Sequence, residues 1–407
     1  MSGRVSSGRA SSGRAGRREA EASAPGRLDV MGGVADYSGS LLLQLPIAER
    51  TRVRLRRTGG THFRLVSTHA ARPAPLRAEV AATEAAMRAA PAWARYVLGA
   101  VALGAARFDY RPEALDVEID SEVPIGGGLS SSAALEVATL RALTELYDLD
   151  WGAAPLALPR LAQRVEHEWV GAPCGLMDQL AVYCGVPGAL LPIRCRPAEV
   201  GAPIPLPPGL GLEVRQSGVV HEVSGRAYGR ARAAAFMGRK LLEEGGVATG
   251  GYLADVDPET FERAYPHLLP ATMTGADFLR EHGPHLDPQT TVRPDEVYPV
   301  RAATAHPIGE HARVTAFAKT LRAANAAARS LTPEELRRLG ALMRASHASY
   351  TAIGLGHAVT DEIAAAALRE PGVYGARVTG GGCGGAVCVL RGDGDRGFST
   401  PAGSGGA

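Results

Sequence analysis

The sequence predicts a protein of mixed helices and strands that is long enough to form two domains. Its 407 residues are 45% hydrophobic and 21% charged, a composition that allows a sizeable buried core. Residues 115–120 alternate apolar and charged side chains, which predicts a half-buried strand. Residues 137–147 carry apolar side chains three and four positions apart, which predicts one face of a helix. Segments of both kinds occur in each half of the chain.

The charge balance argues against two classes of partner. The formal net charge is only +2, so the chain lacks the excess expected of a nucleic-acid groove or a membrane-binding surface. Part of that charge comes from five arginines near the N-terminus: Arg4, Arg9, Arg14, Arg17 and Arg18. No apolar run is long enough to span a bilayer, and no signal-peptide core follows the first residue.

The cysteines favour a reducing compartment. There are five of them, Cys174, Cys184, Cys195, Cys383 and Cys388, and none forms a C-x-x-C pair. An odd count without that spacing disfavours both a disulfide framework and a structural zinc site. We therefore expect a cytoplasmic protein.

Low-complexity segments divide the chain. Residues 1–20 are rich in Ser, Gly and Arg, and residues 393–407 in Gly, Ser and Pro, so both are expected to be disordered tails. The N-terminal tail has the composition of a transit peptide but no apolar periodicity, so a solvated tail is the preferred interpretation. The proline-rich residues 197–208 mark a boundary, which gives an N-terminal domain over 21–208 and a C-terminal domain over 209–392.

The first ordered segment, residues 24–40, is expected to be a loop. Pro25-Gly26 and Gly32-Gly33 interrupt it, and it places three charged residues, Arg27, Asp29 and Asp36, between apolar neighbours. A surface turn with solvated charges is the alternative interpretation. Further along, the sequence predicts a strand at 41–47, a strand pair over 52–67 and an alanine-rich helical stretch over 76–106.

A glycine-rich loop between the strand at 115–120 and the helix at 137–147 predicts a site for nucleotide phosphates. Free backbone N–H groups at a helix N-terminus favour an anion, and serine hydroxyls bind phosphate or Mg²⁺. No lysine begins the helix, and no G-x-G-x-x-G follows the strand, which excludes two common nucleotide loops. The residues of this predicted cradle are Gly126, Gly127, Gly128, Leu129, Ser130, Ser131 and Ser132.

An acid downstream of this loop is a candidate catalytic group. Residues 161–171 have a helical pattern and contain Glu166, and Asp178 follows between the apolar Met177 and Leu180. Such an acid often serves only as a helix cap or an exposed residue. A carboxylate near a phosphate cradle is, however, what phosphoryl transfer to an alcohol uses to orient the hydroxyl and accept its proton.

The second half ends in another glycine-rich segment. A strand at 211–215 is followed by a polar run, 221–228, that leads into a helix, and further helices are predicted at 311–329, 334–350 and 358–369. Residues 376–390 form two short β-rich runs around a loop with five glycines. A flexible hairpin is one interpretation. Because glycines at a strand connection carry an entropic cost, we favour a backbone that another loop or a ligand approaches closely.

These three loops, in this order, resemble those of the GHMP small-molecule kinases, and the resemblance runs from Pro25 to about Leu390. Within that superfamily the residues 25–37, 128–133 and 174–179 resemble the galactokinase branch. The resemblance implies an α+β protein with the two-domain GHMP kinase fold. Its N-terminal domain would be like domain 2 of ribosomal protein S5, its C-terminal domain ferredoxin-like, and its active site would lie between them.

The resemblance also implies a role for individual residues. Asp178 falls on the catalytic aspartate, and Arg27 on the arginine that pairs with it. Ser132 and Glu166 fall on the Mg²⁺ ligands, so ATP and Mg²⁺ are the expected cofactors. The remaining implied positions are the phosphate loop at Gly126, Gly127 and Gly128, the sugar-binding Asp36 and Tyr228, and the third motif at Gly380, Gly381 and Gly382.

One departure from the galactokinase pattern bears on the substrate. Galactokinases carry Glu-His before Thr-Asp-Tyr, and that pair meets the C6 hydroxymethyl end of the sugar. Here those positions are Gly33 and Val34. A C6 hydroxyl buried against Val34 would lose its partners at a cost on the order of 1–3 kcal/mol. L-Arabinopyranose is the galactose ring without C6, so a pentose is expected.

Other segments, among them 28–39, 235–240, 306–308 and 349–356, resemble the kinase domain of L-arabinokinases. We therefore expect an arabinose 1-kinase, with a galactokinase as the alternative. A non-catalytic sugar sensor on the same fold is disfavoured because Arg27, Ser132, Glu166 and Asp178 are all present. The expected partners are a small sugar and ATP, without nucleic acid or membrane. A monomer is plausible, although the sequence does not define the oligomeric state.

Overall fold

The computed structural model describes residues 17–110, 113–172, 174–196, 198–219 and 224–394. Of the tails predicted over 1–20 and 393–407, residues 1–16 and 395–407 lie outside the described residues, as do positions 221–223 of the polar run predicted over 221–228.

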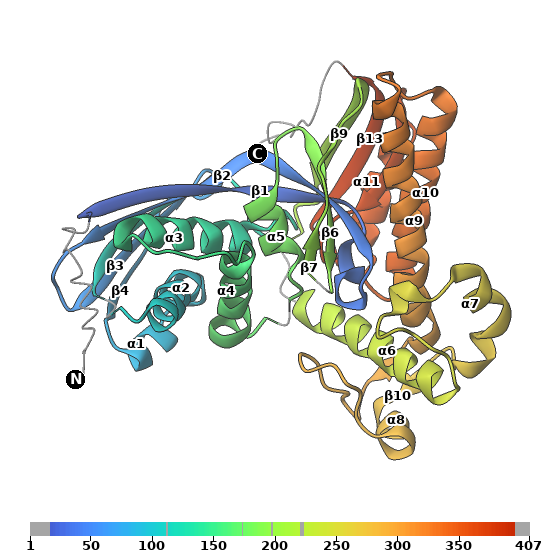
Figure 1. The fold of residues 1–407 in the computed structure, drawn as a ribbon, viewed down its shortest axis with the longest axis horizontal. Coiled ribbons are helices and arrows are strands. Elements are labelled where there is room, and N and C mark those ends of the chain that lie inside the picture. The colour runs from blue at the N-terminus through green and yellow to red at the C-terminus, as the bar shows by residue number, and fades with distance from the viewer. Residues whose placement is uncertain (1–16, 111–112, 173, 197, 220–223, 395–407) are drawn as a thin grey trace, which may run out of the picture.

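The first half of the chain builds a large, mostly antiparallel sheet. Its strands run in the order β4-β3-β5-β2-β6-β7, with β1 paired to β2 and β8 paired to β6, and β3 and β5 pair in parallel. The strands are β1 (Glu19–Met31), β2 (Leu41–Arg57), β3 (His62–His69), β4 (Leu76–Ala81), β5 (Leu115–Ser121), β6 (Ala189–Cys195), β7 (Ala198–Val200) and β8 (Ile204–Pro205). The long ribbon of β1 and β2 spans the upper part of the molecule in Figure 1.

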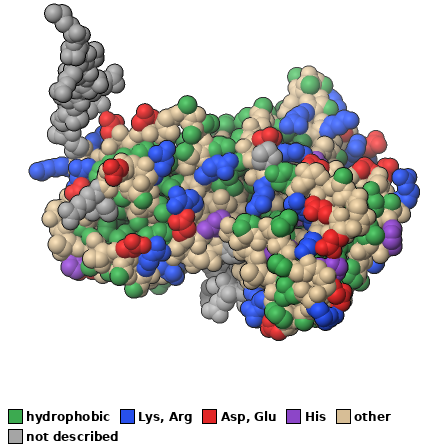
Figure 2. Space-filling view, turned by 60° about the horizontal axis from the view of Figure 1, so that its bottom comes forward, with side chains coloured by type: hydrophobic (Ala, Val, Ile, Leu, Met, Phe, Trp, Pro, Cys, Tyr) green, Lys and Arg blue, Asp and Glu red, His purple; other side chains and the backbone are tan. Residues whose placement is uncertain are grey.

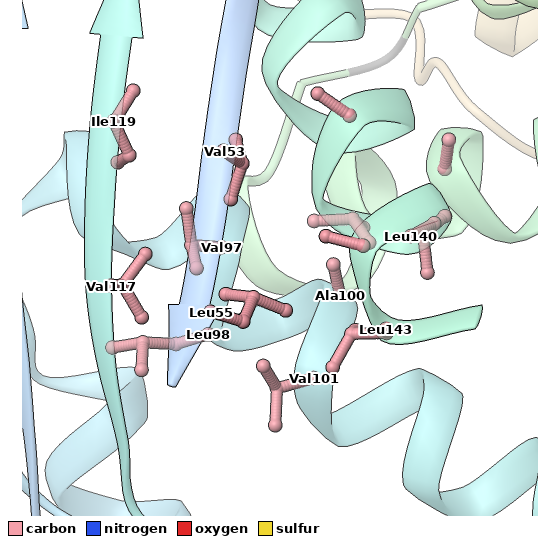
Figure 3. Close-up of a cluster of buried hydrophobic side chains, with 14 of the residues drawn as sticks. Val53, Leu55, Val97, Leu98, Ala100, Val101, Val117, Ile119, Leu140 and Leu143 are labelled. Atoms are coloured by element: carbon pink, nitrogen blue, oxygen red, sulfur yellow. The ribbon is translucent and has the colours of Figure 1, made fainter. Parts of the chain in front are cut away.

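Helices cover one face of this sheet. They are α1 (Glu84–Arg88), α2 (Ala92–Phe108), α3 (Ser131–Tyr147), α4 (Ala157–Val165), the π-helical turn η2 (Glu166–Val170) and α5 (Met177–Cys184). Figure 3 shows the buried side chains between them, with Val53 and Leu55 of β2 facing Leu140 of α3 and Val101 of α2. The alternation predicted for 115–120 is confirmed, because Val117 on β5 is fully buried and its charged neighbours are not.

The opposite face of the sheet is charged. Arg54 on β2 contacts Glu21 on β1 at 2.7 Å and Glu118 on β5 at 3.5 Å.

These cross-strand pairs help explain why the predicted N-terminal boundary needs correction. The predicted tail over 1–20 is too long, because Glu19 and Ala20 already pair with β2. Backbone pairing with a neighbouring strand outweighs the weak β-propensity of this segment.

Four further boundaries differ from the sequence-based expectation. Residues 24–40 were expected to be a loop, but β1 continues through this segment as far as Met31, where its pairing with β2 ends. Residues 76–81, predicted as helical, form the edge strand β4, which pairs with β3. The predicted strand at 41–47 and the start of the pair at 52–67 form one continuous strand, β2. At the other end, β13 continues to Gly394, so the predicted C-terminal tail from 393 also begins too early.

The second half contains a three-stranded antiparallel sheet in the order β12-β13-β9. Its strands are β9 (Gly209–Gln216), β12 (Val373–Val378) and β13 (Ala386–Gly394), and the main helices are α9 (Val300–Ala326), α10 (Pro333–Ala352) and α11 (Ala358–Ala367). Helix α10 begins with a reciprocal cap, in which Thr332 accepts from the backbone of Glu335 and the Glu335 side chain accepts in return. This layer lies to the right of the ribbon in Figure 1.

A third group of elements lies below that layer in Figure 1. It comprises α6 (Ser224–Glu244), η3 (Leu253–Asp255), α7 (Pro258–Ala264), η4 (Pro266–Leu268), β10 (Met273–Thr274), α8 (Gly275–His282) and β11 (Val297–Tyr298), while the short turn η1 (Gly33–Ser38) follows β1. Its core includes Val34 and Tyr37 of η1 and Tyr350 of α10, which joins this group to both other layers.

The two halves share a hydrophobic core. One continuous cluster takes Leu28 and Leu43 from β1 and β2, Leu212 from β9, and Phe317 and Leu339 from α9 and α10. The halves are therefore packed against each other through a dry, apolar interface rather than joined only by a linker.

A buried ion pair lies beside this core. Arg377 on β12 contacts the carboxylate of Asp29 on β1 at 3.0 Å, and both side chains are 0% exposed. Arg377 also donates to the backbone carbonyl of Val30 at 3.0 Å, and Thr379 bonds the backbone of Asp29 in both directions. This polar network fixes the end of β1 against the C-terminal sheet.

Charges of both signs are mixed on the face of the molecule that Figure 2 shows. In Figure 2, Lys and Arg side chains are interspersed with Asp and Glu on the visible face. Within the described part of the chain, none of the helices combines the length and the apolar character needed to cross a bilayer.

We expect Arg377→Met to lower the free energy of unfolding by about 3–5 kcal/mol, because it leaves the buried Asp29 carboxylate without a counter-charge. Urea denaturation measures this. The matched control is Arg52→Met, whose ion pairs with Asp120 and Glu122 are exposed and 3.6–3.7 Å long, and it should change stability little. Equal effects of the two substitutions would contradict the prediction.

Candidate active site

The glycine-rich loop is shaped as a cradle at the start of α3. Gly126 and Gly128 have φ angles of +72° and +68°, and Ser130, which precedes the helix, has a φ of +59°. A Cβ added at Gly128 would stand 3.3 Å from the carbonyl oxygen of Thr379, whereas at Gly126 it would meet no described atom within 4 Å. The loop is thus packed on one side and open on the other, where an anion can reach its backbone.

Arg27 and Asp178 form the centre of the site. The Arg27 Nη2 and Nε atoms lie 2.6 and 3.0 Å from Oδ1 of Asp178, at the start of α5. Arg27 Nη1 also donates to the carbonyl of Gly128 at 2.5 Å, and its backbone N–H donates to Leu129. Arg27 is almost fully buried, but the Asp178 side chain remains 27% exposed. The arginine is therefore a fixed support, and the carboxylate faces the open side of the site.

Glu166 and Ser132 provide a pair of adjacent oxygens. Glu166 is buried at the start of η2, and burial raises the pKa of its carboxyl, an effect that hydrogen bonds from Cys174 and Ser132 partly offset. Among the described residues no three His, Cys, Asp or Glu side chains form a metal-binding group. A hydroxyl and a carboxylate still fit Mg²⁺, which keeps several waters and uses one or two protein oxygens together with substrate phosphates. The buried Ser130 hydroxyl also finds no hydrogen-bond partner among the described residues.

Behind these residues lies an acid that the sequence did not identify. Glu136 on α3 is 0% exposed and accepts from the side-chain amide of Gln179 at 3.3 Å. Burial and the charge of Glu166 raise the pKa of its carboxyl well above the usual range. The only sequence signal was its spacing, since it follows Ser132 by one helical turn.

Asp36 and Tyr228 come together on the other side of the site. The Tyr228 hydroxyl donates to Oδ1 of Asp36 at 3.2 Å. Asp36 is 3% exposed, and burial raises its pKa to about 6, although the charge of Arg232 acts in the opposite direction. A Cβ at Gly175 would overlap the Asp36 carboxylate, at 1.4 Å from Oδ2, so the segment before Asp178 packs directly on Asp36.

Gly33 and Val34 lie one turn before Asp36. The Val34 side chain is 2% exposed and belongs to the apolar cluster around Tyr37. Its backbone N–H donates to the Tyr350 hydroxyl at 2.9 Å. These two positions contribute a glycine and a valine, with no polar side-chain group.

The third glycine loop approaches the first one closely, as predicted from its composition. A Cβ at Gly380 would stand 2.8 Å from the carbonyl oxygen of Gly128, and one at Gly382 would stand 2.5 Å from that of Leu355. At Gly381 it would meet no described atom within 4 Å, so this residue faces the open side. The structure thus brings the predicted groups of all three loops to one place.

Comparison with known proteins agrees with this geometry. Residues 95–186 match the model of the GHMP kinases N-terminal domain, and residues 316–396 match that of the C-terminal domain. A galactokinase from Chloroflexus aggregans is 32% identical to this chain, over 91% of this chain and 83% of the relative.

The chain belongs to the GHMP kinase family.

Two further similarities refine this membership. L-Arabinokinase from Arabidopsis thaliana is 34% identical over 91% of this chain, which spans 42% of that relative's length. The structure of a galactokinase from Lactococcus lactis complexed with galactose matches the fold with a TM-score of 0.73 at 21% identity, covering 93% of this chain and 86% of that one. The α+β fold and the galactokinase-like branch predicted from sequence are confirmed. This GHMP kinase is therefore an ATP-dependent sugar 1-kinase that uses Mg²⁺.

For this GHMP kinase we expect Asp178→Asn to lower kcat by about 10²–10⁴-fold, because an amide cannot accept the proton of the acceptor hydroxyl. Steady-state ADP release measures the loss. Asp295→Asn is the matched control, since Asp295 is exposed and its ion pair, 3.4 Å long, is with the exposed Arg293. Residual activity of Asp178→Asn near that of the control would contradict a role as catalytic base.

Protonation of Asp36 should make kcat/KM for the sugar depend on pH. Because its pKa is raised to about 6, the carboxyl takes up a proton as the pH falls through that value and then no longer offers a charged acceptor to a sugar hydroxyl. At saturating MgATP, kcat/KM for the sugar should fall about tenfold per pH unit below pH 6. Asp36→Asn should have a lower kcat/KM at neutral pH and lack this acid limb. A limb that persists in the variant would assign it to another group.

Proposed function

We propose that this chain transfers the γ-phosphoryl group of ATP to the anomeric hydroxyl of L-arabinose, which yields the sugar 1-phosphate. The observation that carries the choice of sugar is the pair of residues before Asp36. Galactokinases place Glu-His there for the C6 end of a hexose, whereas this chain has Gly33 and Val34. Neither residue offers a polar side chain to the C6 hydroxyl of a hexose, and a pentose has no C6 hydroxyl to satisfy.

The similarity to L-arabinokinase supports the same choice, because that relative is 34% identical to this chain and the Chloroflexus aggregans galactokinase is 32% identical. Galactokinase activity is the second candidate function. Two findings favour it: this chain covers 83% of the length of the Chloroflexus aggregans galactokinase, and it shares the fold of a solved galactokinase.

The chemistry would depend on the pair at the centre of the site. Asp178, at the open side, would orient the anomeric hydroxyl and accept its proton. Arg27, held by Gly128 and Asp178, would hold the carboxylate in place and put positive charge next to the transferred group. A buried guanidinium that already has its partners needs no rearrangement during the reaction.

The phosphates would lie along the first glycine loop. Its open side offers backbone N–H groups and the N-terminus of α3 to the negative charge. Ser132 and Glu166 would hold Mg²⁺, which when bound neutralises charge on the phosphate oxygens. Asp36, with Tyr228, would bind ring hydroxyls on the opposite side and fix the distance from the anomeric carbon to Asp178.

The test is ADP release with L-arabinose and D-galactose side by side at equal MgATP. We expect kcat/KM for L-arabinose to exceed that for D-galactose by at least about tenfold, which is the discrimination expected from one unpaired buried hydroxyl. Asp178→Asn serves as the blank for contaminating kinases. A preference for galactose would overturn the choice of sugar and leave an unusual galactokinase. Failure of a folded sample with both sugars would favour the sugar sensor or another sugar.

A further inference from the structure

The hydroxyl of Tyr350 occupies the space that a side chain at position 33 would need. A Cβ added to Gly33 would stand 1.5 Å from the Tyr350 hydroxyl oxygen, 2.8 Å from Cζ of the same ring and 2.7 Å from Oδ2 of Asp29. Gly33 also has a positive φ of +24°. Position 33 is therefore closed to side chains by a residue that lies more than 300 positions away in sequence.

Tyr350 cannot easily move aside. It is 0% exposed within α10, its ring meets His306 edge-on at a centroid distance of 5.4 Å, and the Arg377 guanidinium lies 5.0 Å from the ring centroid. Its hydroxyl accepts the N–H of Val34 at 2.9 Å and donates to the carbonyl of Gly380 at 3.1 Å. Both of these backbone groups are buried, so both depend on the hydroxyl for a partner.

These contacts join the two sides of the active site. Val34 lies two residues before Asp36, and Gly380 packs against Gly128 of the phosphate loop. One hydroxyl therefore ties the segment that carries the sugar-binding acid to the loop that supports the phosphates.

We propose that Tyr350 is a positioning and specificity-determining residue of this enzyme, acting through Gly33 and Val34. It sets the position of the turn that carries Asp36, and it fills the volume in which galactokinases carry a glutamate side chain. The specificity part of this proposal rests on the proposed function. A side chain at position 33 requires a change at position 350, so residues 33 and 350 determine the sugar specificity together.

A double-mutant cycle tests the coupling. Gly33→Ala, Tyr350→Phe and the double variant are compared with the native chain for kcat, KM for the sugar and melting temperature, with whichever sugar the native enzyme prefers. Tyr350→Phe leaves two buried backbone groups unpaired, so we expect sugar KM to rise about tenfold while kcat changes less than about threefold.

Gly33→Ala should lower kcat/KM by about 100-fold or more in the native background. In the Tyr350→Phe background it should cost about tenfold or less, because the 1.5 Å overlap with the hydroxyl is gone, which leaves the 2.8 Å contact with Cζ and the 2.7 Å contact with Oδ2 of Asp29. Equal costs in the two backgrounds would overturn the proposal. So would an unchanged sugar KM in Tyr350→Phe.

Two controls separate this role from general destabilisation. Tyr298→Phe removes another buried hydroxyl that accepts a backbone N–H, from Arg293 at 2.8 Å, and it should lower the melting temperature without raising sugar KM. Gly59→Ala changes a glycine with a φ of +66° and no described atom within 4 Å of the new Cβ, so it reports the cost of the backbone alone.

The two proposals fail in different ways. If the native enzyme prefers galactose, the choice of arabinose and the specificity role of Tyr350 are both overturned. The positioning role is then decided by the melting temperatures of the two single variants and the double variant, which must be non-additive. If arabinose is preferred and the cycle is additive, only the inference about Tyr350 is overturned.

Discussion

The buried charge of Asp29 is the constraint on which the active site depends. A carboxylate that is 0% exposed must be paired, and Arg377 from the C-terminal sheet provides the counter-charge. Asp29 also accepts from the side-chain amide of Gln44 at 2.7 Å and from the backbone N–H of Gly33 at 3.1 Å. The Asp29 carboxylate therefore connects its own strand, β1, to β12, to β2 and to the turn η1. Arg27, two residues earlier on the same strand, is thereby fixed where it meets Asp178.

Much of the fold and the site could be predicted because their signals are local. The alternation over 115–120 reflects the two faces of one strand, and the glycines and serines of 126–132 reflect the geometry of one loop and one helix N-terminus. The pairing of Arg27 with Asp178 came from the family resemblance rather than from periodicity, and the observed distances agree with it. The galactokinase-like fold could be predicted for the same reason, because the three loop motifs that identify it are short and distinctive in sequence.

The features that escaped prediction depend on partners that are remote in sequence. Residues 19–24 carry little β-forming sequence and become a strand because β2 lies alongside them. Glu136 has the sequence context of an ordinary helical residue, and only the packing of Glu166 and Gln179 against it makes it part of the site. From the sequence, Gly33 was interpreted only as the loss of a polar side chain. The structure shows why no side chain fits there, because Tyr350 of α10 occupies the space that it would need.

The ion pair between β1 and β12 also has a consequence for biosynthesis. Asp29 and Arg377 are 348 residues apart in the chain, and Arg27, only two residues from Asp29, contacts Asp178 at the candidate active site. Domains generally fold from the N-terminus as the ribosome releases them, but contacts of such high sequence separation form only after a large loop closes. The nascent N-terminal sheet therefore leaves the ribosome with the Asp29 carboxylate lacking its counter-charge until β12 has been synthesised. The strand position that carries Arg27 is fixed only after β12 has been made.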